Sequence, residues 1–168
     1  MRRRSFALVL FAASVGLSMP AAATVTVTFI APENYRDANT YGRYRGPASA
    51  SALRDLEAHL IKLGARYLST GHALRIEVLD IDLAGEYEPF RASLYEVRVL
   101  RGVTWPRINL RYVLERDGEV LRQGDEAVAD PAYLFGSTHF SDTDRLYYEK
   151  RMLEDWFRRR FADRRAAQ

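Results

Sequence analysis

Residues 108–129, INLRYVLERDGEVLRQGDEAVA, decide the fold because they encode two strands joined by a tight turn. Asp117-Gly118 is a favoured sequence for a two-residue hairpin turn. It predicts an antiparallel pair formed by 108–115 and 119–129. Apolar side chains occupy every second position of the first strand, which is typical of a strand with one buried face: Ile108, Leu110, Tyr112 and Leu114.

Three further segments have the alternation of strands: 24–29, 73–83 and 94–100. In 73–83 the apolar positions change parity, which predicts either a β-bulge near Val78-Leu79 or a strand that becomes buried on both faces. In 94–100 we expect Tyr95, Val97 and Val99 to point inward, and Glu96 and Arg98 to point outward.

Two segments have the apolar period of helices. Residues 49–68 form the first, with Ser49 or Ser51 as the N-cap. The second runs from a capping box at Ser141 and Asp144 to about Phe161. Its apolar stripe is Leu146, Met152, Leu153, Trp156, Phe157 and Phe161.

The element order is therefore β-α-β-β-β-β-α, which favours the α+β class. We expect a single domain, with a largely antiparallel sheet of about five strands and two helices packed on one face. The polar, turn-rich stretch 31–47 is predicted to be a long loop.

Residues 1–23 are typical of a secretory signal peptide. Arg2, Arg3 and Arg4 precede a short apolar run, and an Ala-x-Ala site predicts cleavage after Ala23. The mature chain, 24–168, is then a single domain with a basic C-terminal end in the periplasm or the medium. No later apolar run is long enough to cross a membrane.

Removal of this leader changes the charge balance. Three of the 25 basic residues lie in it, so 24–168 carries 22 basic and 22 acidic residues. A net charge near zero disfavours nucleic acid as a partner. The absence of cysteine excludes disulfides, thiol nucleophiles and thiolate metal sites, and no motif implies a cofactor.

The segment 80–88, DIDLAGEYE, is the strongest candidate for chemistry because four carboxylates lie within nine residues. Asp80, Asp82 and Glu86 could hold a hard cation, although the pattern departs from a calcium loop at Ala84 and Arg91. A pair of carboxylates could also serve acid–base chemistry. The structural alternative is that Asp80 and Asp82 accept bonds from turn amides or an arginine.

Trp105-Pro106-Arg107 is a second candidate. Pro106 holds Trp105 extended at a strand entrance, and Arg107 can pair with Asp80 or Asp82 across the sheet. The same four residues, Asp80, Asp82, Trp105 and Arg107, would equally form a small-ligand pocket with an aromatic wall.

The basic C-terminal end comprises Arg158, Arg159, Arg160, Arg164 and Arg165. Cations are favoured at a helix C-terminus, so a solvated charged end accounts for them. Weak contact with an anionic membrane is the alternative.

The chain also resembles an exported bacterial family without an assigned activity, domain of unknown function 3016. The resemblance implies a single envelope domain and no particular reaction. It spans nearly all of 24–168 and is carried by V25-x-V27-x-F29, P32-E33, Y35-x-D37, D80-x-D82-L83-A84-G85, P106-R107 and Y148-E149-K150-x-M152-L153-x-D155-W156-F157.

These observations favour a soluble periplasmic or secreted module that is not an enzyme. It would bind an envelope protein or a small ligand, or support the envelope, through the open face of the sheet or the loop 31–47. The alternative is a cation-dependent enzyme or ligand binder that uses Asp80, Asp82 and Glu86. A third hypothesis is a membrane-surface protein acting through the arginine-rich end.

Overall fold

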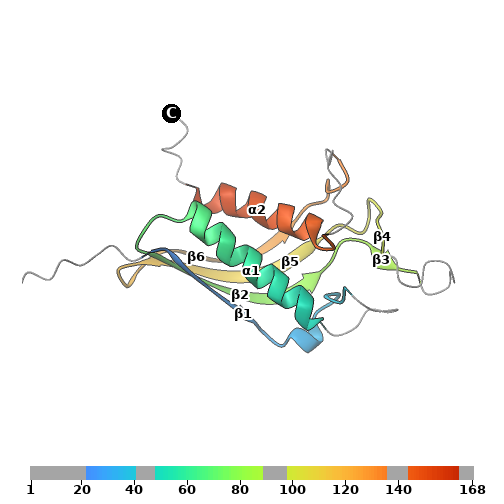
Figure 1. Cartoon of the computed structure of the whole chain (residues 1–168), viewed down its shortest axis with the longest axis horizontal. Coiled ribbons are helices and arrows are strands. Elements are labelled where there is room, and N and C mark those ends of the chain that lie inside the picture. Colours follow the sequence, from blue (N-terminus) through green and yellow to red (C-terminus); the bar gives the residue numbers. More distant parts are fainter. Residues whose placement is uncertain (1–21, 41–47, 89–97, 136–143, 163–168) are drawn as a thin grey trace, which may run out of the picture.

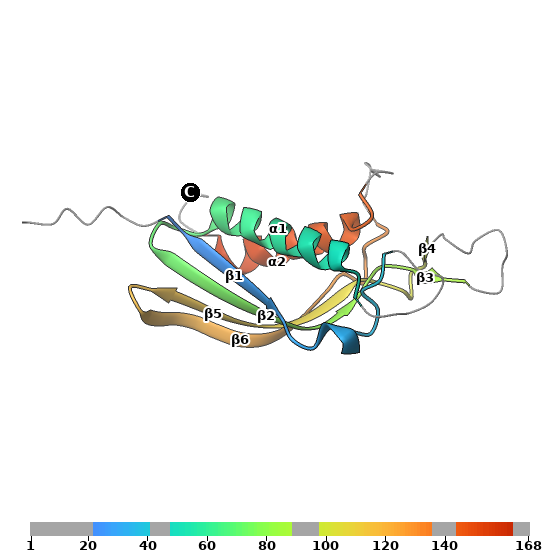
Figure 2. The same ribbon diagram turned by 60° about the horizontal axis from the view of Figure 1, so that its bottom comes forward.

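The computed structural model describes residues 22–40, 48–88, 98–135 and 144–162. They form one α+β domain with two layers: both helices lie across the same face of a twisted sheet (Figures 1 and 2). The predicted leader, 1–23, lies almost entirely outside the described residues. None of the described helices is long and apolar enough to span a membrane.

The main sheet has four strands in the order β1-β2-β5-β6. β2 pairs antiparallel with β5, and β5 with β6, whereas β1 runs parallel to β2. The bounds are Thr24–Phe29 for β1, His72–Asp82 for β2, Arg107–Arg116 for β5 and Glu119–Ala129 for β6. The sheet is thus largely antiparallel, as predicted.

The parallel pair is connected by α1, Ala50–Tyr67, which packs against the sheet. Ser49 is its N-cap, because the Ser49 hydroxyl accepts a hydrogen bond from the Ala52 N–H. Gly64 lies where α1 crosses β1, and a Cβ there would approach Val25 Cγ2 to 2.0 Å. The absence of a side chain at Gly64 therefore allows the close approach of helix and strand.

The hairpin has the predicted turn. Asp117 and Gly118 have φ angles of 52° and 82°, the left-handed values that a type I′ turn requires. The four predicted inward residues of β5 are buried. The predicted bulge is also present, since the register of β2 against β5 shifts between Val78 and Asp80.

The predicted strand 94–100 differs from the structure. Only Arg98–Val99, β4, is a strand among the described residues there, and it pairs with β3, Glu86–Tyr87, in a separate two-stranded sheet. Tyr95, Glu96 and Val97 lie outside the described residues. The outward orientation predicted for Arg98 is wrong, because its side chain is only 14% exposed and pairs with a buried aspartate.

The final helix, α2, spans Tyr147–Phe161 and begins later than the predicted capping box. Ser141 lies outside the described residues. Asp144 instead accepts hydrogen bonds from the Leu146 N–H and the Lys150 ammonium. The predicted apolar stripe of α2 is buried against the sheet and α1.

Part of the predicted loop 31–47 contributes to the core. After a short 3₁₀ helix, Pro32–Asn34, the side chains of Tyr35, Asp37 and Ala38 are buried. The Tyr35 hydroxyl donates a 2.7 Å hydrogen bond to the Val78 carbonyl, and burial raises the pKa of Tyr35 to about 12. This segment therefore closes the end of the sheet at which β2 finishes.

Candidate functional site

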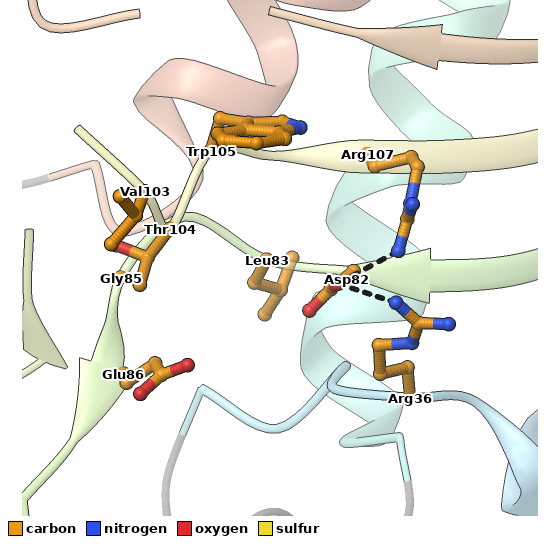
Figure 3. Close-up of a pocket in the computed structure, with 9 residues that line it drawn as sticks. All are labelled: Arg36, Asp82, Leu83, Gly85, Glu86, Val103, Thr104, Trp105 and Arg107. Carbon is orange, nitrogen blue, oxygen red and sulfur yellow. Dashed lines mark hydrogen bonds and ion pairs between the residues drawn. The ribbon is translucent and has the colours of Figure 1, made fainter. Parts of the chain in front are cut away.

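A hollow of about 330 Å³ lies where β2 leaves the main sheet and β5 enters it. Its floor and walls come from four parts of the chain, the segment before α1, the end of β2, the start of β3 and the turn before β5 (Figure 3). We call it the Trp105 hollow. Its polar and aromatic lining comprises Arg36, Asp82, Glu86, Thr104, Trp105 and Arg107.

One wall carries a carboxylate between two guanidinium groups. Arg107 and Asp82 are direct register partners on β5 and β2. Arg107 Nη2 lies 3.3 Å from Asp82 Oδ2, and Arg36 Nη1 lies 3.5 Å from the same oxygen (Figure 3). The predicted pairing of Arg107 across the sheet is confirmed, with Asp82 as its partner.

These ion pairs are longer than the 2.7–2.9 Å of a strong charge-assisted bond. Arg36 and Arg107 are about half and one-third exposed, so both can still donate to another acceptor. Arg107 Nε is buried and has no partner among the residues the structure describes. The guanidinium pair can therefore bind an anionic group that enters the hollow.

Asp80 has a different role from Asp82. Its Oδ1 accepts a 2.8 Å hydrogen bond from the Arg36 backbone N–H, and Asp80 does not line the hollow. This bond holds the segment that carries Arg36 against β2. The structure thus brings Asp82, Trp105 and Arg107 together as predicted, together with Glu86, and leaves Asp80 behind the wall.

Asp80, Asp82 and Glu86 do not form the metal-binding cluster that was hypothesised from the sequence. No group of three or more Asp, Glu or His side chains close enough to hold an ion occurs within the described parts of the chain. Asp82 also lies beside two guanidinium groups, which repel a divalent cation.

Trp105 supplies the aromatic wall. Its side chain is 38% exposed, although Pro106 beside it is buried. A large apolar side chain at a hollow rim offers a flat surface on which a ligand can stack. Thr104 lies immediately before Trp105 in the turn that leads into β5, and its hydroxyl donates a hydrogen bond to the Arg101 carbonyl.

A buried charge network lies beneath the hollow. Arg98 Nη2 donates to Asp37 Oδ2 at 2.8 Å, and the Asp37 side chain is only 2% exposed. The same guanidinium donates to the carbonyls of Leu83, Ala84 and Gly85. These bonds hold the chain between β2 and β3 in the shape that forms the hollow floor.

Glu149 of α2 holds this turn from the other side. Its Oε1 accepts a 2.6 Å hydrogen bond from the Ala84 N–H, whereas Oε2 has no partner among the described residues. The side chain is fully buried, and the loss of solvation raises the pKa of Glu149.

Gly85 completes the turn with a φ of 77°. A Cβ there would lie 2.9 Å from the Val99 carbonyl oxygen, so the crossing of these two chain segments requires glycine.

Sequence reasoning missed Asp37, Arg98 and Glu149. For Glu149 a signal existed, because it follows Leu146 by three residues and precedes Leu153 by four. A carboxylate on the apolar stripe of a helix indicates a buried polar contact. For Arg98 no comparable signal exists, since an arginine in a strand is usually exposed.

The sequence matches a known protein family. The chain belongs to the proteins of unknown function of the DUF3016 family, whose model matches residues 23–159. No curated protein and no solved structure matches it.

Proposed function

We propose that the protein is an exported binding module without catalytic activity, and that the Trp105 hollow binds a small zwitterionic molecule such as an amino acid or a short peptide. The observation that carries this proposal is the convergence of Trp105, Arg107 and Asp82 on one solvent-reachable hollow. Export rests on the predicted leader 1–23 and cleavage after Ala23.

The charges of the hollow support a ligand with separated charges and no net charge. Its lining has two guanidinium groups and two carboxylates. Arg36 and Arg107 flank Asp82, whereas Glu86 lies away from this trio (Figure 3). A ligand carboxylate would bind the arginines, and its ammonium would be favoured on the side of Glu86.

The size and the aromatic wall support the same class. A volume of about 330 Å³ is at the lower end of the range for ligand pockets, which suits a metabolite rather than a polymer. The apolar part of an amino acid or peptide can lie against the Trp105 indole. The nucleophile–base pairs that enzymes of acyl transfer use have no counterpart among the described residues of the lining, which favours binding over turnover.

Thermal unfolding with defined probes tests the proposal. Free amino acids and dipeptides are the probes, and hexoses and the divalent cations calcium, magnesium, manganese and zinc are the comparison. At a hundredfold excess over Kd, a bound zwitterion stabilises the fold by about 2.7 kcal/mol. Trp105→Ala and Arg107→Gln should remove that stabilisation, whereas Arg75→Gln on the open face of the sheet should retain it.

The absence of a shift with every zwitterion would contradict the proposal, and so would a shift that survives both hollow variants. A shift with a divalent cation that Asp82→Asn abolishes would favour the cation-dependent alternative in its place.

A further inference from the structure

A second hollow, of about 730 Å³, lies at the opposite end of the sheet, between the β5–β6 hairpin and the C-terminus of α2. We call it the basic hollow. Its described lining contains no carboxylate, and it contains five groups of basic type: His72, Arg116, Arg122, Arg159 and Arg160. Such an excess of one sign attracts anions.

Most of the positive charge in this lining is not neutralised by a nearby carboxylate. Within the part of the chain that the structure describes, the ion-pair partner of Arg116 is its exposed neighbour Asp117, at 3.6 Å. Arg122 donates to the backbone carbonyl of Arg160, which carries no full charge. Arg160 does pair with a carboxylate, Glu126, at 2.6 Å. Arg116, Arg122 and Arg159 are therefore the groups most available to an anion.

The second half of the lining is apolar. Leu68, Leu114 and Phe161 form the inner wall. Leu121 lies at the rim and is 50% exposed, and Val120 beside it is 52% exposed. The register of β5 against β6 passes from Arg122 to Val120, so Leu121 is the extra residue of a bulge. The hairpin tip thus presents the exposed Leu121 next to Arg116 and Arg122, whereas Val120 pairs with Glu115 and does not line the hollow.

The start of the domain lies at the same end. Thr24 pairs with Ala73, and the adjacent His72 pairs with Arg116. Figures 1 and 2 both place the start of β1, the hairpin tip and the end of α2 together. Thr24, the first residue after the predicted cleavage site, therefore lies beside the basic hollow.

We propose that the basic hollow docks the domain onto anionic phospholipid headgroups of a membrane surface. Arg116, Arg122 and Arg159 bind lipid phosphates, and Leu121 reaches the boundary of the acyl chains. Cations combined with exposed apolar side chains are the features of proteins that lie on anionic membranes. Of the basic end that the sequence indicated, Arg159 and Arg160 line the hollow, and Arg158 pairs with Asp155 instead. Arg164 and Arg165 lie outside the described residues.

Vesicle co-sedimentation tests this proposal with the chain as purified from the producing cells, its N-terminus identified by mass spectrometry. The probes are vesicles of phosphatidylcholine alone and vesicles that also contain phosphatidylglycerol. The protein should bind only the anionic vesicles, and salt should release it. Arg116→Gln/Arg159→Gln should weaken binding about 25-fold, from about fivefold per arginine. Both arginines are exposed, so we expect the double variant to fold.

The matched control is Arg54→Gln/Lys62→Gln, which removes two charges from exposed positions of α1 and should leave binding unchanged. Leu121→Ser should weaken binding while the charge stays constant. Equal sedimentation with both vesicle types would overturn the proposal, as would equal losses in the two double variants. Tight binding of soluble glycerol phosphate, unaffected by Leu121→Ser, would also overturn it in favour of a soluble anion.

Discussion

The two ends of the sheet carry opposite charge arrangements. At the Trp105 hollow, two arginines are matched by two carboxylates in the lining. At the basic hollow, four arginines and His72 share a described lining without a carboxylate. Residues 24–168 carry 22 basic and 22 acidic residues, and the fold places these charges in different arrangements at its two ends. The balanced end suits a small ligand with both charges, and the basic end suits an anionic surface.

The antiparallel pair β2–β5 separates these ends. Asp82 faces Arg107 at one end of the pair, and His72 faces Arg116 at the other. The ten residues of β5 span about 30 Å at a rise near 3.3 Å per residue. Direct electrostatic coupling over that distance is screened at physiological salt, so each end can be changed without disturbing the other.

The largest expected effect concerns the buried pair beneath the Trp105 hollow. Asp37→Ala leaves the Arg98 guanidinium buried without its carboxylate. We expect a loss of about 3–5 kcal/mol in the free energy of unfolding, measured with urea. Asp125→Ala, which breaks an exposed pair with Arg111, is the control. Equal losses in the two variants would show that the buried pair does not support this end.

The next effect compares one glycine from each end. Gly85 and Gly118 have similar positive φ angles, but only at Gly85 would a Cβ meet the backbone of another segment. Gly118→Ala should cost about 1–2 kcal/mol from the left-handed conformation alone. Gly85→Ala should cost about 1–3 kcal/mol more because the crossing must open. Urea unfolding of both variants measures the difference, and a larger loss at Gly118 would contradict the described packing of the hollow floor.

A smaller effect depends on pH. Because burial raises the pKa of Glu149, the folded state holds its proton more tightly than the unfolded chain, whose carboxyl titrates near 4.5. The free energy of unfolding should therefore fall as the pH rises above about 4.5, by at most about 1.4 kcal/mol per pH unit, until the raised pKa is passed. Below that window the contribution is constant.

Glu149→Gln should remove this decline, because an amide can accept from the Ala84 N–H and does not titrate. Urea unfolding across a pH series compares the two proteins. The variant should match the wild type at acidic pH and exceed it near neutrality. The result would contradict this expectation if Glu149→Gln lowered the free energy of unfolding by the same amount at neutral and acidic pH. Glu149 would then contribute through its hydrogen bond alone.

The smallest effect is expected on the open face of the sheet between the two ends. Arg111 pairs with Glu77 and Asp125, and all three side chains are well exposed. Arg111→Gln should leave thermal unfolding, zwitterion binding and vesicle binding close to those of the wild type. A clear loss of either binding activity would show that the two ends are coupled through the sheet.

Local patterns predicted most of the fold. The alternation in β5, the Asp117-Gly118 turn and the parity change at Val78-Leu79 each depend on a few neighbouring residues, and the structure confirms all three. These are features that short-range geometry determines. The pairing of Arg107 with Asp82 was one of two alternatives that the sequence left open, because β2 and β5 are neighbours in the sheet without being joined by a hairpin.

The remainder depends on contacts distant in sequence. Arg98 is buried because Asp37, 61 residues earlier, reaches it, and no periodicity of 94–100 contains that information. The basic hollow likewise joins Arg160 of α2 to Arg122 of the hairpin, 38 residues earlier. The sequence showed a cluster of arginines at the C-terminal end, but it did not predict that Arg116 and Arg122 lie beside them.

The most direct test of the two-ended account is a nuclear magnetic resonance titration that uses the two tryptophans as reporters. Trp105 lines the hollow, whereas Trp156 is buried and donates its indole N–H to Glu126. Titration with the zwitterion that gives the largest thermal shift should move the Trp105 indole resonance and leave that of Trp156 in place. Bicelles that contain phosphatidylglycerol should instead broaden the amides of Val120, Leu121 and Arg159. A zwitterion that moves neither indole, or bicelles that perturb Trp105 as strongly as Leu121, would contradict the assignment of separate roles to the two ends.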